Sequence, residues 1–149
     1  MEGFVGQGPL FIFSLIFVLG LVVVIHELGH YLAGRAFGAA AESFSVGFGR
    51  SLVEFTDKRN TRWRINWLPL GGFVKFVGED PRDTVEGQAD YKSAPIGRKY
   101  TDLSLGQRSI VAVAGPVANF ILAIFIFSLT AIVFGKPVHK IVMMDIMEG

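Results

Sequence analysis

The pattern of hydrophobic and polar positions divides the chain into two long apolar segments and a mixed segment between them. Residues 10–25 are apolar apart from one serine and one glycine, and residues 110–134 carry no charge over 25 positions. A bilayer span needs about 20 predominantly apolar residues in a helix. The second segment therefore predicts a transmembrane helix. The first reaches that length only if its helix continues through the polar residues 26–30 toward Ala33.

The segment between these helices alternates with the period of a β-strand. In the stretch TRWRINWLPL, Trp63, Ile65 and Trp67 point to one side, and the residues between them point to the other. The flanking stretches SLVEFT and GGFVKFVG are similarly short and rich in β-forming residues, with turns expected at residues 57–60 and 69–72. We expect a small antiparallel sheet or pair of hairpins at the membrane surface, followed by an exposed polar loop.

Composition supports a membrane protein. Hydrophobic residues make up 51% of the 149 positions and charged residues 18%, with a mean hydropathy of +0.48. A secretory signal peptide is the alternative for the N-terminus, but residues 1–9 contain no Lys or Arg and no cleavage pattern follows the apolar run. Cysteine is absent, which excludes disulfides and thiolate metal sites.

The distribution of charge predicts the orientation in the membrane. Of the 14 Lys and Arg residues, 12 lie between Arg35 and Arg108. By the positive-inside rule, this middle segment is cytoplasmic, and both ends of the chain are extracytoplasmic. The net charge of +1 argues neither for nor against nucleic acid. We expect the lipid bilayer as a partner and no nucleic acid.

The motif HELGH at the end of the first apolar segment carries the chemistry. On a helix, His26 and His30 project from one face about one turn apart, close enough to bind one small cation. Two imidazoles leave a zinc ion enough positive charge to lower the pKa of a bound water, and Glu27 can accept the proton as hydroxide attacks a carbonyl. The motif therefore predicts zinc-dependent hydrolysis of peptide bonds.

The membrane context strengthens this interpretation. In a soluble protein, the same pattern could be a surface helix with solvated side chains. Ionisable groups at membrane depth cost several kcal/mol and usually mark a functional site. If the helix enters the hydrocarbon at Leu10, His26 lies roughly 24 Å further on, within a core of about 30 Å. The metal would lie inside the bilayer, nearer its cytoplasmic face.

A catalytic zinc normally has three protein ligands, and this chain supplies two obvious ones. His139 follows the second span and should emerge on the opposite side of the membrane. Ala33 and Ala36 stand where soluble enzymes with the longer HExxHxxGxxH motif have Gly and His. Glu42 and Glu54 lie in strand-like or loop-like sequence and are poor candidates. We expect the third ligand to be missing from this chain.

The sequence resembles the site-2 protease family of intramembrane zinc metalloproteases, and more narrowly the bacterial regulator-of-sigma-E protease type. The resemblance covers nearly the whole chain through four motifs in the family's order: HELGH at 26–30, FSVGFG at 44–49, LPLGGFVKF at 68–76 and GQRSIVAVAGPVANF at 106–120. It implies His26 and His30 as zinc ligands and Glu27 as the catalytic base, which agrees with the reading from the residues.

The resemblance also implies substrate-binding residues. GGFVKF looks like the family's membrane-associated β-loop, which is thought to pair with an extended substrate as an added strand. Alternatively, its glycines simply make a turn. Asn119 matches a family motif near the active site, and it could contact substrate or make a structural hydrogen bond between helices. The implied substrate-binding residues are Gly71, Gly72, Phe73, Val74, Lys75 and Asn119.

We therefore expect a mainly α membrane protein with two transmembrane helices joined by a cytoplasmic-side segment. The expected parts are residues 1–37 (first helix with the zinc motif), 38–109 (β-segment and loop), 110–135 (second helix) and 136–149 (the start of an extracytoplasmic PDZ-like domain). Family members continue into further helices that carry an aspartate, the third zinc ligand. The chain would then be the N-terminal portion of a bacterial inner-membrane protease, weak or inactive alone.

The predicted function is an intramembrane zinc endopeptidase that cleaves transmembrane segments of membrane-anchored proteins. One alternative is a membrane protein that binds or transports a divalent cation. A carrier would favour more polar residues along the second helix, which offers only Asn119, Ser128 and Thr130. The other alternative is a non-catalytic scaffold, although metal binding alone would not need Glu27. The sequence gives neither the substrate nor the oligomeric state.

Overall fold

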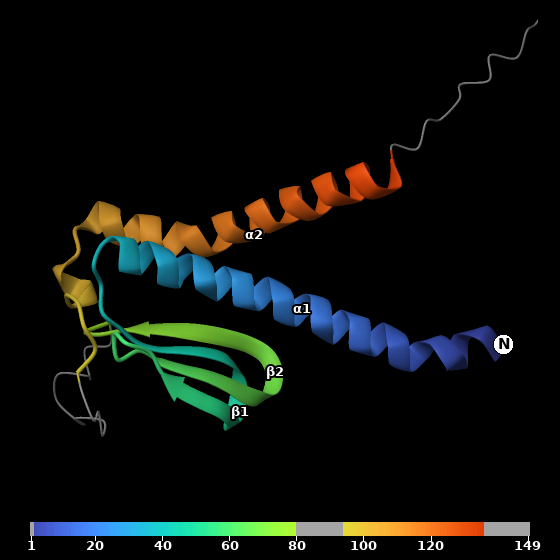
Figure 1. The fold of residues 1–149 in the computed structure, drawn as a ribbon, viewed down its shortest axis with the longest axis horizontal. Coiled ribbons are helices and arrows are strands. Elements are labelled where there is room, and N and C mark those ends of the chain that lie inside the picture. The colour runs from blue at the N-terminus through green and yellow to red at the C-terminus, as the bar shows by residue number, and fades with distance from the viewer. Residues whose placement is uncertain (1, 80–93, 136–149) are drawn as a thin grey trace, which may run out of the picture.

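The fold consists of two long apolar helices and a small sheet (Figure 1). The computed structural model describes residues 2–79 and 94–135. Its elements are α1 (Glu2–Ala36), β1 (Ala41–Thr56), β2 (Arg62–Phe76), the short 3-10 helix η2 (Tyr100–Asp102) and α2 (Leu105–Phe134). The predicted combination of two apolar helices with an antiparallel sheet is confirmed. The expected PDZ-like segment 136–149 and most of the predicted polar loop lie outside the described residues.

The helix ends follow from local sequence signals. α1 stops before Gly38, whose φ of 81° lies in the left-handed region, and the Ala39 N–H donates to the Gly34 carbonyl (2.9 Å). α2 begins with a capping box, in which Ser104 and Gln107 exchange side chain to backbone hydrogen bonds of 3.0 and 3.3 Å. The start of α2 is thereby fixed relative to the sheet that precedes it.

Small residues bring α1 and α2 into close contact. A Cβ added to Gly29 of α1 would collide with the carbonyl oxygen of Ala114 and would lie 2.8 Å from the Cβ of Ala118 on α2. Such small-residue contacts let helix backbones approach closely in a membrane. Figure 1 shows the helices adjacent at the C-terminal end of α1 and the N-terminal part of α2, and apart at their other ends. The HELGH motif lies at the close end.

The sheet is made of two long, bent strands, and the first part of β1 lies between two parts of β2 and pairs with both. Phe44 pairs with Val74 on one side and with Trp63 on the other. Residues 43–46 of β1 pair with residues 62–65 of β2, and the residue numbers increase in the same direction along both segments, so these two segments run parallel. The hairpin around residues 57–61 and the pairing of β1 with residues 72–76 are antiparallel. The last part of β2 is therefore an edge of the sheet among the described strands.

The predicted turn at residues 69–72 is wrong in one respect, because β2 continues through it as a strand. Gly71 has a φ of 85°, which bends the strand without ending it. β1 likewise begins earlier than the predicted stretch SLVEFT and contains FSVGFG, with positive φ at Gly47 and Gly49. The glycines act as bends within long strands, because pairing with the partner strand is present on both sides of each bend even though the register shifts there.

The hairpin turn at residues 57–60 is confirmed, and Asp57 organises it. Its carboxylate accepts from the backbone N–H groups of Arg59 (2.8 Å) and Thr61 (3.0 Å) and from Trp63 Nε1 (3.1 Å). Burial alone would raise the pKa of Asp57, but these hydrogen bonds hold it below its ordinary value. Asn60 adopts the left-handed region (φ 62°) that such turns require.

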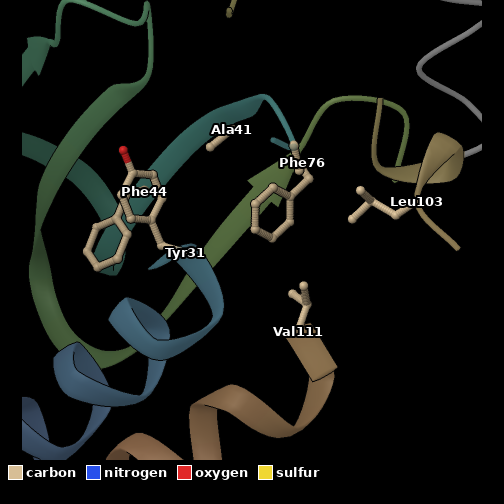
Figure 2. Packing of buried hydrophobic residues seen from close by; sticks show 7 residues of the cluster. Tyr31, Ala41, Phe44, Phe76, Leu103 and Val111 are labelled. Carbon is tan, nitrogen blue, oxygen red and sulfur yellow. The ribbon is translucent and has the colours of Figure 1, made fainter. Parts of the chain in front are cut away.

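A small apolar core joins the sheet to both helices. Figure 2 shows Tyr31 of α1 beside Phe44 of β1, and Phe76 at the end of β2 extending toward Val111 of α2. A Cβ on Gly34 would collide with the ring of Phe76, so this glycine makes room for the ring on α1. The core thus fixes the end of β2 against the part of α1 that follows HELGH.

Candidate metal centre

α2 holds both histidines of the HELGH motif by their Nδ1 atoms. His30 Nδ1 lies 2.7 Å from the backbone carbonyl oxygen of Val111, and His26 Nδ1 lies 3.1 Å from Nδ2 of Asn119. The two imidazole rings are 4.8 Å apart between centroids and nearly perpendicular. Metal-binding histidines commonly have their second ring nitrogen held in this way, which fixes the orientation of the ring.

Gly115 of α2 leaves a space at the Nε2 atoms of both histidines. A Cβ added there would lie 2.8 Å from His26 Nε2 and 2.7 Å from His30 Cε1, and it would collide with His30 Nε2. The two Nε2 atoms therefore face the same small volume, which exists because residue 115 has no side chain. This is the arrangement that two imidazole ligands of one ion require.

Glu27 lines a cavity of about 270 Å³ between the helices and the end of β2. The lining comprises Glu27, His30, Val74, Phe76, Glu79, Tyr100, Val111 and Ala112. Burial raises the pKa of the Tyr100 phenol, and the negative charge of Glu79 raises it further against the opposing effect of Arg108. Tyr100 is therefore a neutral hydroxyl near neutral pH, beside the carboxylate that the sequence singled out.

The predicted substrate-binding residues of β2 divide between two surroundings. Gly72 lies against α1, where its added Cβ would be 3.2 Å from Glu27 Cγ, and Val74 lines the same cavity as Glu27. Lys75 forms an ion pair with Glu42 (3.2 Å), whereas Phe73 lines a separate hollow on the sheet. Alternate residues of a strand point to opposite faces, which explains this division.

The remaining predicted residues also have definite places. Gly71 packs against the ring of Phe48, where an added Cβ would lie 2.5 Å from the nearest ring atom. Asn119 contacts His26, as described above. The sequence did not single out the Val111 carbonyl, because a backbone acceptor has no residue signature.

No third metal ligand stands beside the histidines in the described part of the chain. Among these residues, no three His, Cys, Asp or Glu side chains are grouped to hold an ion. Glu42 is 3.2 Å from Lys75, and Glu54 is 3.3 Å from Arg64, so both carboxylates serve ion pairs on the sheet. His139 lies outside the described residues. The described site is thus a pair of imidazoles with a neighbouring carboxylate.

The fold and site define a helical protein with an HExxH motif whose histidines are held against a second helix. The family model of peptidase family M50 matches residues 14–148, and the chain therefore belongs to this metalloprotease family. The resemblance to site-2 proteases is confirmed.

Curated relatives agree with this assignment. The chain is 40% identical over 147 residues to metalloprotease MmpA of Caulobacter vibrioides, covering 91% of this chain and 37% of the relative. It is 40% identical over 142 residues to the putative zinc metalloprotease Atu1380 of Agrobacterium fabrum, covering 93% and 38%. It is 38% identical over 129 residues to the regulator of sigma-E protease RseP of Escherichia coli, covering 87% and 27%. The chain thus spans less than two fifths of the length of these relatives.

Proposed function

We propose that this chain forms the zinc-binding and water-activating part of an intramembrane endopeptidase that cleaves membrane-anchored proteins. One observation carries the proposal: the Nε2 atoms of His26 and His30 face one volume at Gly115, with Glu27 beside them on a cavity. Membership of peptidase family M50 and relatives named zinc metalloproteases support the same chemistry.

The residues present fit a zinc ion. Both imidazoles have Nδ1 held by α2 and Nε2 directed at the space that Gly115 leaves, which a methyl group would fill. When bound, zinc supplies a Lewis acid that lowers the pKa of a water molecule and polarises the scissile carbonyl. Further ligands would come from the region of the relatives that extends beyond this chain.

Glu27 is the proposed general base. It follows His26 on α1 and lines the cavity together with His30, so it lies beside the histidine pair at a hollow large enough for water. A carboxylate placed there accepts a proton from the attacking water and can deliver it to the leaving amine. Tyr100, which lines the same cavity with a neutral hydroxyl, can donate a hydrogen bond to a bound substrate.

The edge of β2 is the proposed place of the substrate. Residues 72–76 pair with β1 along one edge, and the strand lies against Glu27 at Gly72 and Val74. An extended peptide added along the other edge would present its backbone to the carboxylate, whereas a helix hides its backbone. A transmembrane segment that unwinds at this level would be brought to Glu27 by main-chain hydrogen bonds.

The proposed site lies within the bilayer. α1 from Gly8 and the whole of α2 are long and apolar enough to cross a membrane. Large apolar side chains on α2 and on the sheet are exposed, among them Phe127 (75%) and Trp67 (72%). Arg35 lies in the last turn of α1 and Arg108 in the first turn of α2, which places basic residues at the close end of the helix pair. By the positive-inside rule, this end is cytoplasmic and the chain ends are extracytoplasmic.

The proposal is tested in liposomes with a chain extended to the length of its relatives and a single-span reporter protein. Glu27→Gln should abolish cleavage while zinc content stays at the wild-type level, because removal of a general base costs about 10²–10⁴ in rate. Glu54→Gln is the matched control, since Glu54 is in an exposed ion pair on the sheet. A zinc-loaded wild type that cleaves no such reporter, or a fully active Glu27→Gln variant, would refute the proposal.

A further inference from the structure

The carboxamide of Asn119 on α2 contacts a histidine of the HELGH motif. Its Nδ2 lies 3.1 Å from His26 Nδ1, while its Oδ1 is buried without a hydrogen-bond partner in the described part of the chain. The two orientations of a carboxamide differ by a rotation of 180° and occupy the same space. The chemistry of His26 therefore decides which orientation suits the site.

The hydrogen bond made by His30 shows which tautomer a metal-binding histidine needs at this site. The Val111 carbonyl can only accept a hydrogen bond, so His30 must donate to it from Nδ1–H and keep a lone pair on Nε2. A neutral imidazole carries one proton, and the hydrogen bond at one nitrogen determines which nitrogen is free to bind a metal. His30 is thus set in the tautomer that a metal ligand needs.

His26 reaches the same tautomer only if Asn119 accepts from it. If Nδ2 donates to His26 Nδ1, that nitrogen must be unprotonated, and the ring proton then lies on Nε2, where it blocks the volume at Gly115. If the amide is rotated, Oδ1 accepts from Nδ1–H, and Nε2 is left with its lone pair. The rotation exchanges which amide atom lacks a partner, so the metal at Nε2 determines the preference.

We infer that Asn119 is a positioning residue for the metal centre. When the ion binds, Asn119 turns its Oδ1 toward His26 Nδ1–H and holds the ring in the metal-binding tautomer, as the Val111 carbonyl does for His30. This inference rests on the proposed function. It gives Asn119 a role toward the ligand set, distinct from the substrate contact that the sequence resemblance implies.

Two substitutions separate these roles in the extended chain. Asn119→Leu keeps similar size and removes the acceptor, whereas Asn119→Asp keeps the shape and can only accept. Zinc affinity, measured by competition with a chromophoric chelator, should fall 10–100-fold in Asn119→Leu and should equal or exceed the wild-type value in Asn119→Asp. In ¹⁵N NMR of the zinc-bound protein, the His26 Nδ1–H proton should be protected from exchange with water in Asn119→Asp and should exchange rapidly in Asn119→Leu, where no acceptor holds it. Thr130→Ala, which removes only a local bond to the Ile126 carbonyl, is the control on the same helix.

The outcomes distinguish the inference from the proposed function. If the wild type binds no zinc, the proposed function and the inference both fail. If the wild type binds zinc and Asn119→Leu binds it equally well, only the inference fails, and a loss of cleavage at saturating zinc would then assign Asn119 to substrate contact. If Asn119→Asp weakens zinc as much as Asn119→Leu, the amide acts as a donor, and the inference is overturned.

Discussion

Gly115→Ala is the substitution that most sharply separates the metal site from the fold. Ordinary van der Waals contact begins at 3.4 Å, whereas the new Cβ would lie 2.8 Å from His26 Nε2 and closer still to His30 Nε2. His26 Nε2 would have to retreat by at least about 0.6 Å, which exceeds the tolerance of about 0.2 Å for metal to ligand distances. The methyl group occupies the volume that an ion shared by both rings needs.

The effect on the fold should be small by comparison. Replacing Gly by Ala inside a helix stabilises it by about 1 kcal/mol, and overpacking costs about 1–3 kcal/mol. The net cost is then about 0–2 kcal/mol, so the helix pair should persist. Zinc affinity should fall by more than about 100-fold, because loss of outer-shell support alone costs 10–100-fold.

The assay compares zinc affinity and helicity of the extended chain with those of Gly106→Ala. Gly106 lies on the same helix and has no atom within 4 Å of an added Cβ, so its substitution should leave zinc binding unchanged. Circular dichroism reports whether both variants keep their helices. If Gly115→Ala binds zinc within about threefold of wild type while Gly106→Ala does the same, the ion does not lie between the two Nε2 atoms, and the reasoning fails.

Further predictions concern the sheet. Gly72→Ala places a Cβ 2.8 Å from a backbone oxygen and 3.2 Å from Glu27 Cγ, so cleavage should fall roughly tenfold with zinc content unchanged, and Gly20→Ala, which has open space, should cleave normally. Equal cleavage by both variants would show that the contact between β2 and Glu27 does not matter for catalysis. Phe76→Ala removes a ring that is 3% exposed, and unfolding in detergent should show a loss of about 3–5 kcal/mol; a loss below about 1 kcal/mol would contradict its place in the core. Because the pKa of Asp57 is lowered in the fold, its stabilisation is complete above the unfolded-state pKa of about 3.9 and is lost as the pH falls through the folded-state value. Asp57→Asn should remove this acid dependence from hydrogen exchange of the hairpin amides, and an unchanged profile below about pH 4 would contradict it.

Helical spacing explains why part of the site could be predicted. Residues four apart share a face of any helix, so HELGH alone brought His26 and His30 together and placed Glu27 beside them. The contacts across to α2 could not be derived in this way, because they depend on how two helices pack. Asn119 was linked to the site only through a family resemblance, the sequence alone did not single out Gly115, and the Val111 carbonyl carries no sequence signal at all.

The sheet shows the same limit. Alternation around Trp63 predicted strands, and the turn at residues 57–60 followed from its polar residues. The glycines at 69–72 suggested a turn, yet pairing with β1 on either side keeps Gly71 within one bent strand. A local signal for a turn was overruled by long-range pairing, which sequence periodicity does not report.

The most direct test of the account is X-ray absorption spectroscopy of the zinc-loaded extended chain, compared with the His26→Asn and His30→Asn variants. We expect two imidazole nitrogens at about 2.0–2.1 Å from zinc in the wild type, one in each variant, and a matching loss of affinity. Zinc without imidazole ligands in the wild type, or unchanged imidazole scattering in both variants, would show that His26 and His30 are not the metal centre.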